Sequence, residues 1–208
     1  MNNYCFPYDF DTTLIKEQRT YQVVTPASTY PVSLTEAKLH LKVDITTDDD
    51  LITNLIVAAT QVSEEYTNRF FILTVIKQVC SNFKELNELF KSPVNSVTNV
   101  RYYNSNNTHQ TLDPNRYVVN NQFEPCQINL VVDGSFPDIA DRVDAVESQY
   151  SVGYGDSSDV PNVIKQAILL TLGNWYENRM SVITGRTTTE MPQSAKWLLD
   201  TYKVQVVR

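Results

Sequence analysis

The side chains best suited to catalysis or metal binding are few in this chain, and they are scattered. Its two histidines, His40 and His109, have no cysteine or carboxylate at the spacing that zinc ligands require. The acidic run Asp48-Asp49-Asp50 offers oxygen ligands, but the alternating acids, the glycine and the distant glutamate of a calcium loop are missing. The pattern therefore predicts no metal site, and it favours a helix N-terminus for the acidic run.

Motifs that bind nucleotides or carry a nucleophile are incomplete. Gly153-Tyr154-Gly155 lies between an expected strand and an expected helix, but the third glycine of a dinucleotide site is absent. Thr184-Gly185-Arg186-Thr187 lacks the Gly-Lys-Ser/Thr of a phosphate loop, and no Gly-x-Ser-x-Gly sequence occurs. We therefore expect no catalytic residues, no cofactor and no enzyme. The alternative is a soluble enzyme whose acidic site is built from scattered aspartates and glutamates.

The composition is that of a soluble protein with one domain or two small ones. The 208 residues are 42% hydrophobic and 20% charged, and no apolar run reaches the roughly 18 residues of a membrane span. Met1 to Tyr4 shows no secretion signal. The three cysteines, Cys5, Cys80 and Cys126, are far apart and form no CxxC pair, so we expect synthesis in a reducing cytoplasm.

The net charge of −7 argues against a protein that grips nucleic acid. Affinity for phosphate comes mainly from Lys and Arg, and here the acids outnumber them. We therefore expect no specific binding to double-stranded DNA.

Two helices are predicted near the front of the chain. Ser33 and Glu36 have the spacing of a capping box, in which each side chain bonds the other residue's backbone N–H. Asp48-Asp49-Asp50 should start the second helix, with its carboxylates satisfying free N–H groups. The predicted polar side of that helix holds Thr53, Thr60, Gln61 and Glu64, and its apolar face holds Leu51, Ile52, Leu55, Ile56, Ala59, Val62 and Tyr66.

Two more helices are predicted near the end of the chain. Pro161 opens a long helix over 161–179 that is too apolar for an ordinary surface helix, so we expect it to be buried on two sides. Met191-Pro192 opens a terminal helix. The apolar residues of the long helix are Val163, Ile164, Ala167, Ile168, Leu170, Leu172 and Trp175, and those of the terminal helix are Ala195, Leu198, Leu199 and Tyr202.

Between the two helical segments the sequence period falls towards two, which predicts strands over 73–82, 97–103, 116–121, 127–132 and 144–152. The fold class is therefore α+β: a small helical bundle with an inserted antiparallel β domain and an extended N-terminal arm. The predicted parts are the arm over 1–30, the helical domain over 31–69 and 158–203, the β domain over 70–157 and a C-terminal tail over 204–208.

Two separated blocks of sequence resemble the head–tail connector, or adaptor, proteins of long-tailed bacteriophages. The first is PVSLTEAK (31–38), followed by Leu41, the acidic run and a helix ending EYTNR (65–69). The second is the strand, the GYGD turn at 153–156, the helix VPNVIKQAILLTLGNWYENR (160–179) and the terminal helix that starts at a proline. The resemblance covers residues 31 to 203, in the same order.

The resemblance implies a structural virion protein, made in the host cytoplasm and located in the virion neck. It implies a homo-oligomeric ring of twelve copies between the portal protein and the next neck or tail protein. Such a ring extends the DNA channel, with double-stranded DNA only passing through, and it attaches the tail; no membrane is involved. A monomeric neck or tail structural protein is the alternative within this class.

Two groups of residues are predicted at subunit or portal contacts. Tyr176 and Arg179 end the long helix and are of residue types enriched at interfaces, with core packing as the alternative for Tyr176. Trp175 is expected in the core. The end of the chain, from Lys203 to Arg208, is expected to dock on the portal, because its β-forming valines would otherwise be exposed on a chain end. These residues are Lys203, Val204, Gln205, Val206, Val207 and Arg208. The alternative is that this tail pairs with the β domain of its own subunit.

Overall fold

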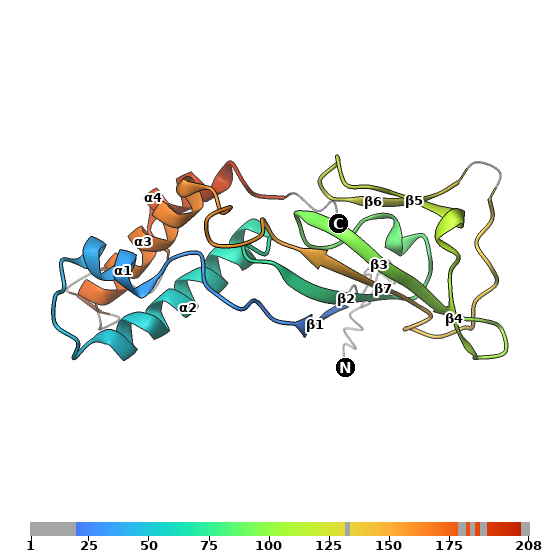
Figure 1. Ribbon diagram of the computed structural model, residues 1–208, viewed down its shortest axis with the longest axis horizontal. Coiled ribbons are helices and arrows are strands. Elements are labelled where there is room, and N and C mark those ends of the chain that lie inside the picture. The colour runs from blue at the N-terminus through green and yellow to red at the C-terminus, as the bar shows by residue number, and fades with distance from the viewer. Residues whose placement is uncertain (1–19, 132–133, 179–181, 184–185, 188–190, 205–208) are drawn as a thin grey trace, which may run out of the picture.

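Helices gather at one end of the elongated molecule and strands at the other (Figure 1). The computed structural model describes residues 20–131, 134–178, 182–183, 186–187 and 191–204. Helices and antiparallel strands are both present, so the predicted α+β class is confirmed. None of the described helices has the length and apolar character of a membrane span. In chain order the elements are β1 (Thr20–Thr25), α1 (Leu34–Leu41), α2 (Asp49–Thr67), β2 (Thr74–Cys80), η2 (Glu85–Asn87), β3 (Val94–Tyr103), β4 (His109–Thr111), η3 (Pro114–Arg116), β5 (Tyr117–Asn120), β6 (Gln127–Leu130), β7 (Val146–Val152), α3 (Asn162–Glu177), β8 (Val182–Ile183), β9 (Arg186–Thr187) and α4 (Gln193–Asp200).

Helix α1 begins as the sequence predicts. The N–H of Glu36 donates to the Ser33 hydroxyl over 3.2 Å, and the N–H of Ser33 donates to the Glu36 carboxylate over 2.8 Å. Both halves of the capping box are therefore formed. Lys42 ends the helix in the left-handed conformation, with φ of 56°.

Helix α2 begins at the acidic run, but the run does not cap the helix as predicted. The side chain of Asp48 receives no hydrogen bond from the backbone of the helix. Its Oδ2 accepts one from the Tyr176 hydroxyl over 2.5 Å, and Asp49 Oδ1 pairs with Lys38 Nζ at 2.6 Å. The acids therefore tie the start of α2 to α3 and α1.

The buried face of α2 also differs from the predicted one. The sequence places Val62 on the apolar face and Thr60 opposite, yet Thr60 is 5% exposed and Val62 is 40% exposed. Ser63 and Thr67 are buried as well. Their hydroxyls donate to backbone carbonyls one turn earlier, over 2.7 and 2.8 Å, which makes them acceptable in a core. The packed face therefore includes small hydroxyl residues that hydropathy reads as polar.

Helix α3 lies at the centre of the helical end and packs against α1, α2 and α4. It follows Pro161, as predicted, and its neighbour α4 follows Pro192. Val163 remains 37% exposed, so the helices of this chain leave part of the apolar surface of α3 uncovered. The fully buried side chains of the helical core include Ile52, Ala59, Ile164, Ala167, Ile168, Leu172, Ala195 and Leu199.

The main sheet has five strands in the order β1-β2-β7-β3-β4, and every pairing is antiparallel. Strands β2 and β7 alternate between buried and half-buried residues, which is the period of two that the sequence predicts. Ile76 and Tyr150 are opposite each other on the covered face, where they join a second core with Ile128 of β6. The Tyr150 hydroxyl donates to Gln78 Oε1 over 2.9 Å, so this buried phenol is satisfied.

Two edge strands lie outside the predicted strand segments. Strand β1 falls within residues 1–30, the expected arm, and pairs with β2, with Gln22 opposite Lys77. Strand β4 pairs with the end of β3, and its three residues are all exposed. An edge strand that is exposed on both faces carries no alternation in hydropathy, so the period gave no signal for it. Residues 1–19 of the expected arm lie outside the described residues.

Two backbone segments join the helical end to the sheet and bond to each other. One leads from α2 to β2, and the other leads from β7 to α3. Tyr154 N–H donates to the Phe71 carbonyl over 3.0 Å, and Leu73 N–H donates to the Gly155 carbonyl over 2.9 Å. Gly153 has φ of +120°, and a Cβ there would lie 2.5 Å from the Ile72 carbonyl oxygen. Only glycine fits at this crossing, so the glycine pair is explained by the backbone conformation.

Candidate interaction site

The described part of the chain holds no group of three or more His, Cys, Asp or Glu side chains that could bind a metal. His109 Nε2 lies 3.1 Å from Glu147 Oε1, and its ring stacks on Tyr103. Among the acids of the predicted helix start, Asp48 and Asp49 bond to Tyr176 and Lys38, as above. These side chains are therefore engaged in holding the elements together.

A cluster of charge lies on the open face of the sheet. Glu147 of β7 is the central acid, and Lys77 of β2, Arg101 of β3 and His109 of β4 lie around it. Lys77 Nζ is 3.5 Å from Glu147 Oε2. Arg101 Nη1 is 4.0 Å from the other oxygen, Oε1, which is also the oxygen that His109 Nε2 approaches. Strand register brings these residues together, because Arg101 is opposite Glu147 on one side, and on the other side Lys77 is two residues from Val79, which is opposite Glu147. Glu147 is therefore paired with two permanent cations, Lys77 and Arg101, in a chain that is acidic as a whole.

Arg69 joins three parts of the chain at the boundary between helices and strands. It is 7% exposed, and its two terminal nitrogens donate to the two oxygens of Glu124 over 2.6 and 2.5 Å. Its Nε donates to the Tyr202 carbonyl over 2.5 Å. Two residues later Val204 N–H donates to the Thr67 carbonyl over 3.0 Å. The end of α2, the β5–β6 connection and the segment after α4 are thus bound together.

Beside this junction a second buried cation holds strand β1. Lys91 is 1% exposed, and its ammonium lies 5.2, 5.7 and 6.0 Å from the ring centroids of Tyr21, Phe70 and Phe90. Glu65 Oε1 is 3.4 Å from the ammonium and accepts a hydrogen bond from the Tyr21 hydroxyl over 3.2 Å. Tyr21 is therefore the side chain that fastens β1 over the cation.

Glu64 is the acid whose titration is most affected by the fold. Burial raises the pKa of its carboxyl to about 7. A hydrogen bond from the Phe71 N–H, over 2.9 Å, and the nearby Lys91 act in the opposite direction and lower this pKa. The carboxyl accepts the N–H of the residue that leads from α2 towards the sheet, so its charge state bears on the junction.

Some of the predicted contact residues make contacts within the chain, and others lie outside the described residues. Tyr176 bonds to Asp48 within the chain. Lys203 Nζ lies 4.5 Å from the centroid of the Tyr66 ring, and Val204 is only 7% exposed. Trp175 is partly buried and packs against the helical core, as expected of a core residue. Arg179, Gln205, Val206, Val207 and Arg208 lie outside the described residues.

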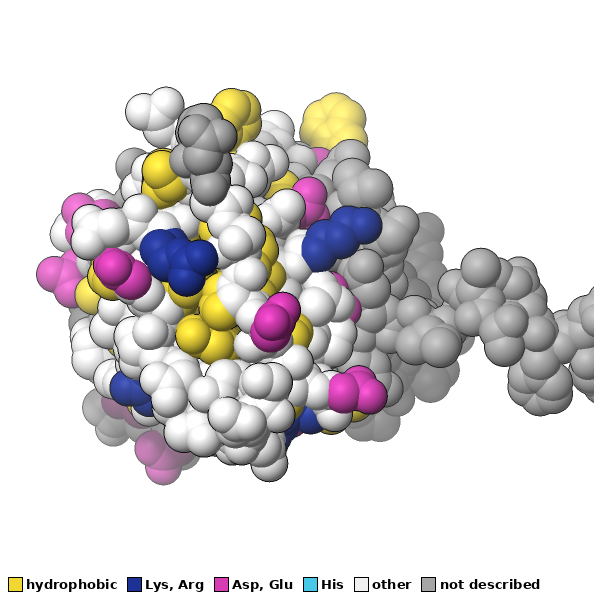
Figure 2. Space-filling view, turned by 90° about the vertical axis from the view of Figure 1, so that its right-hand side faces the viewer, with side chains coloured by type: hydrophobic (Ala, Val, Ile, Leu, Met, Phe, Trp, Pro, Cys, Tyr) yellow, Lys and Arg dark blue, Asp and Glu magenta, His cyan; other side chains and the backbone are white. Residues whose placement is uncertain are grey.

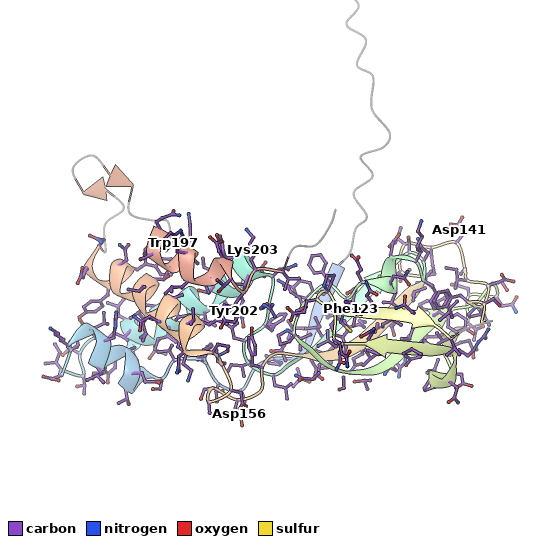
Figure 3. The ribbon with its side chains drawn as sticks, turned by 90° about the horizontal axis from the view of Figure 1, so that it is seen from above. Phe123, Asp141, Asp156, Trp197, Tyr202 and Lys203 are labelled. Atoms are coloured by element: carbon purple, nitrogen blue, oxygen red, sulfur yellow. The ribbon has the colours of Figure 1, made fainter. Side chains whose placement is uncertain are left out.

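The side of the helical end that carries α4 has the most exposed aromatic side chain of the described residues. Trp197 of α4 is 77% exposed, and it stands on the same side as Lys203 (Figure 3). Helix α4 is held beside α2 by the Tyr66 hydroxyl, which donates to Asp200 Oδ1 over 2.5 Å. One turn before this contact, α2 carries Val62 and α4 carries Trp197, and both are exposed. The sequence offered a signal for Trp197, since it falls between the predicted core positions of the terminal helix.

Helix α1 and the loop after it carry two further strongly exposed apolar side chains of the helical end. Leu39 is 80% exposed and Ile45 is 61% exposed. Beside them is an open depression of about 570 Å³. It is lined by Thr35, Lys38, Leu39, Lys42, Val43 and Asp44.

The far end of the sheet presents a third surface. Figure 2 shows hydrophobic side chains near the middle of this face, with acidic and basic side chains around them. In this part of the molecule Phe136 stacks on Phe83 at 4.2 Å between ring centroids, and Val143 is 86% exposed. The molecule therefore has exposed apolar side chains at both ends.

Comparison with known proteins shows a similarity to phage connectors. Residues 31–130, from the start of the α1 region to the end of β6, match the family described as "Phage gp6-like head-tail connector protein". The resemblance to head–tail connector proteins that the sequence indicated is therefore confirmed. No curated protein matches the chain.

Solved structures with the same fold come from a gene transfer agent (GTA), and each match covers 91% of this chain and 97% of that chain. A chain in "Virion of native gene transfer agent (GTA) particle" is 18% identical, with a TM-score of 0.74. Chains in "Neck of empty GTA particle computed with C6 symmetry" and "Neck of native GTA particle computed with C12 symmetry" are 18% and 17% identical, with TM-scores of 0.73 and 0.70. At this identity the matches show a shared fold.

Proposed function

We propose that this chain, which resembles the phage head-tail connectors, is a structural protein of the virion neck that assembles as a ring of twelve copies. In this role one side of the ring contacts the portal protein and the other contacts the next neck or tail protein. The observation that carries the proposal is the agreement of two matches. The connector family matches residues 31–130, and the fold matches chains of particle necks over 91% of the length.

The charge of the chain suits a passage for DNA. A wall of net charge −7 repels phosphate and lets a duplex slide, whereas a basic wall would hold it. The ring would therefore extend the DNA channel, help retain packaged DNA and present a surface for tail attachment, without binding DNA specifically. We assign no enzymatic activity, because the family that matches residues 31–130 is described as a head-tail connector protein.

We further propose that the chain divides into a helical domain over 31–69 and 158–203 and an inserted β domain over 70–157, with β1 of the expected arm added to the edge of the β domain's sheet. The two separate cores, one made of helices and one beneath the sheet, support this division. The C-terminal tail is proposed to dock on the portal. Since Val204 is buried against Thr67 of its own chain, it serves as the anchor, and docking falls to Gln205–Arg208.

Particles that lack this protein, complemented with tagged variants, test the proposed function. The full-length protein should co-purify with portal-containing heads, and imaging of the neck should show it as a ring between portal and tail. Finding the protein away from the neck, or as a single copy there, would contradict the proposal.

Deletion of 205–208 tests the docking of the tail. This variant should fold with an unchanged circular dichroism spectrum and should be lost from portal-containing heads. Deletion of 204–208 also removes the buried anchor, so it should in addition lower the melting temperature. If the protein without 205–208 stays on the heads, the tail is not the docking element.

A further inference from the structure

We propose that Trp197 of one copy inserts into the depression beside α1 of the next copy, and that this contact closes the ring. The inference rests on the proposed function, since it describes how the copies of that ring meet. A closed ring needs heterologous contacts, in which one patch meets a different patch on the next subunit. The molecule must therefore present two unlike, complementary surfaces on two of its sides.

Trp197 has the properties of the inserting side chain. It is 77% exposed, although tryptophan is among the side chains that gain most from burial. Its helix is rigidly placed, because Ala195 and Leu199 are buried in the core and Asp200 is bonded to Tyr66 of α2. A large aromatic side chain held out on a fixed helix loses little conformational freedom when it is bound.

The depression beside α1 has the properties of the receiving surface. Its volume of about 570 Å³ leaves room for an indole ring, and its apolar lining comes from Leu39 and Val43. Lys38 is held in place, because its Nζ donates to Ile45 O over 2.9 Å and to Asp49 Oδ1 over 2.6 Å. The depression is therefore built from fixed elements rather than from a loose surface.

The two surfaces lie on different sides of the helical end. Figure 3 shows α4, with Trp197, along one side, whereas α1 lies on the other side. Both helices pack on the α2–α3 pair that separates them. Translating and rotating one copy onto the next can therefore bring α4 of the first against α1 of the second, and the same contact can repeat around a ring.

The chemistry of the depression matches that of an indole. Lysine ammonium groups are attracted to the face of a tryptophan ring, and Lys42 is exposed at the rim. The indole N–H is a donor only, and the Asp44 carboxylate in the lining is an acceptor. Asp200, one turn after Trp197 and exposed, adds a negative charge that would come near the lysines. Tryptophan in such a pocket is a frequent centre of binding energy.

Cross-linking between copies tests the contact in particles. In a Cys5→Ser background, where Cys80 and Cys126 are buried, the variant Trp197→Cys/Leu39→Cys is treated with a short bismaleimide. We expect a ladder of covalent multimers, because every copy carries both partners. In a mixture of copies that carry only Trp197→Cys and copies that carry only Leu39→Cys, cross-linking should give dimers and no larger species. The matched control Val143→Cys/Leu39→Cys, with the first cysteine at an equally exposed site on the sheet end, should give monomers.

Substitution gives an independent measurement. Trp197→Ala should lower the amount of protein retained in the neck by about tenfold or more, while Val143→Ala should leave it unchanged. Both proteins should keep the melting temperature of the original chain in isolation, which separates a lost contact from a lost fold.

The failure of this inference is distinct from the failure of the proposed function. If the original protein is present as a neck ring, but the double-cysteine variant gives no ladder there or Trp197→Ala is fully retained, the inference is wrong and the function stands. Dimers from Trp197→Cys alone would show an isologous contact and would also overturn it. If the original protein is absent from the neck, both are overturned.

Discussion

Arg69 and Glu124, 55 residues apart in the chain, form a two-point ion pair at the boundary between the helices and the strands. The Arg69 guanidinium is buried, whereas the Glu124 side chain is 41% exposed. A buried cation with a fixed carboxylate and a backbone carbonyl is costly to disturb, because removal of one partner leaves the others unpaired.

We therefore expect Arg69→Met to lower the free energy of unfolding by about 2–3 kcal/mol, somewhat less than for a fully buried pair because Glu124 is partly solvated. Urea denaturation followed by circular dichroism measures this change. Arg101→Met is the matched control, since its side chain is 44% exposed and lies 4.0 Å from Glu147; its cost should be below about 1 kcal/mol. Equal effects of the two substitutions would contradict the structural role of Arg69.

The raised pKa of Glu64 predicts a pH dependence of stability. Because its pKa is about 7 in the folded chain and 4.5 is the ordinary value, the folded state binds more protons between these pH values. The contribution of Glu64 to stability is therefore greatest below about pH 4.5, and it falls as pH rises to about 7.

The substitution Glu64→Gln should remove this slope, since the amide keeps an acceptor for the Phe71 N–H and carries no charge. At pH 8 the variant should be more stable than the original chain by about 3 kcal/mol, and near pH 4.5 the two should be similar. Denaturant melts across this range provide the measurement. Glu177→Gln, at an exposed site, should keep the original slope; a slope that persists in Glu64→Gln would assign it to another group.

The two tryptophans should respond differently to truncation. Trp175 is partly buried against the helical core, so Trp175→Ala should cost about 2–3 kcal/mol, less than a fully buried tryptophan. Trp197→Ala should stay within about 0.5 kcal/mol in the isolated chain, because the side chain is mostly exposed. Chemical denaturation of both variants measures this difference. A cost below about 1 kcal/mol for Trp175→Ala would mean that the helical core does not depend on it.

The isolated protein should not bind duplex DNA measurably at physiological salt, because its net charge is −7. Fluorescence anisotropy with a labelled duplex tests this. Micromolar binding that falls steeply with salt would show that a local cluster outweighs the total. Lys77 and Arg101, on the open face of the sheet, would then be the first residues to replace.

The sequence predicted the elements better than it predicted the faces they bury. Ser33 with Glu36, Pro161 and Pro192 mark helix starts through local backbone chemistry, which does not depend on the rest of the fold. The buried face of α2 could not be read in the same way. Thr60 and Ser63 look polar in the sequence, and only their packing against neighbouring helices shows that they belong to the core.

The junction residues illustrate the same limit. Arg69 and Lys91 read as surface cations, because their partners come from distant parts of the chain: Glu124 and Tyr202 for Arg69, and Tyr21 for Lys91. No spacing pattern links such positions. Trp197 was visible as an aromatic residue out of phase with its helix, but its complement beside α1 exists only once the helices are assembled.

The paired crossing segments, one between α2 and β2 and one between β7 and α3, make the connection between the helices and the sheet stiff. Their backbone bonds, Tyr154 N–H to Phe71 O and Leu73 N–H to Gly155 O, link two segments that run along the long axis (Figure 1). A pull along that axis would load these bonds together in shear rather than peel them apart one by one. Arg69, in the first of these segments, adds bonds to Glu124 and to the Tyr202 carbonyl, so a force along the axis would also have to break side-chain contacts at this boundary.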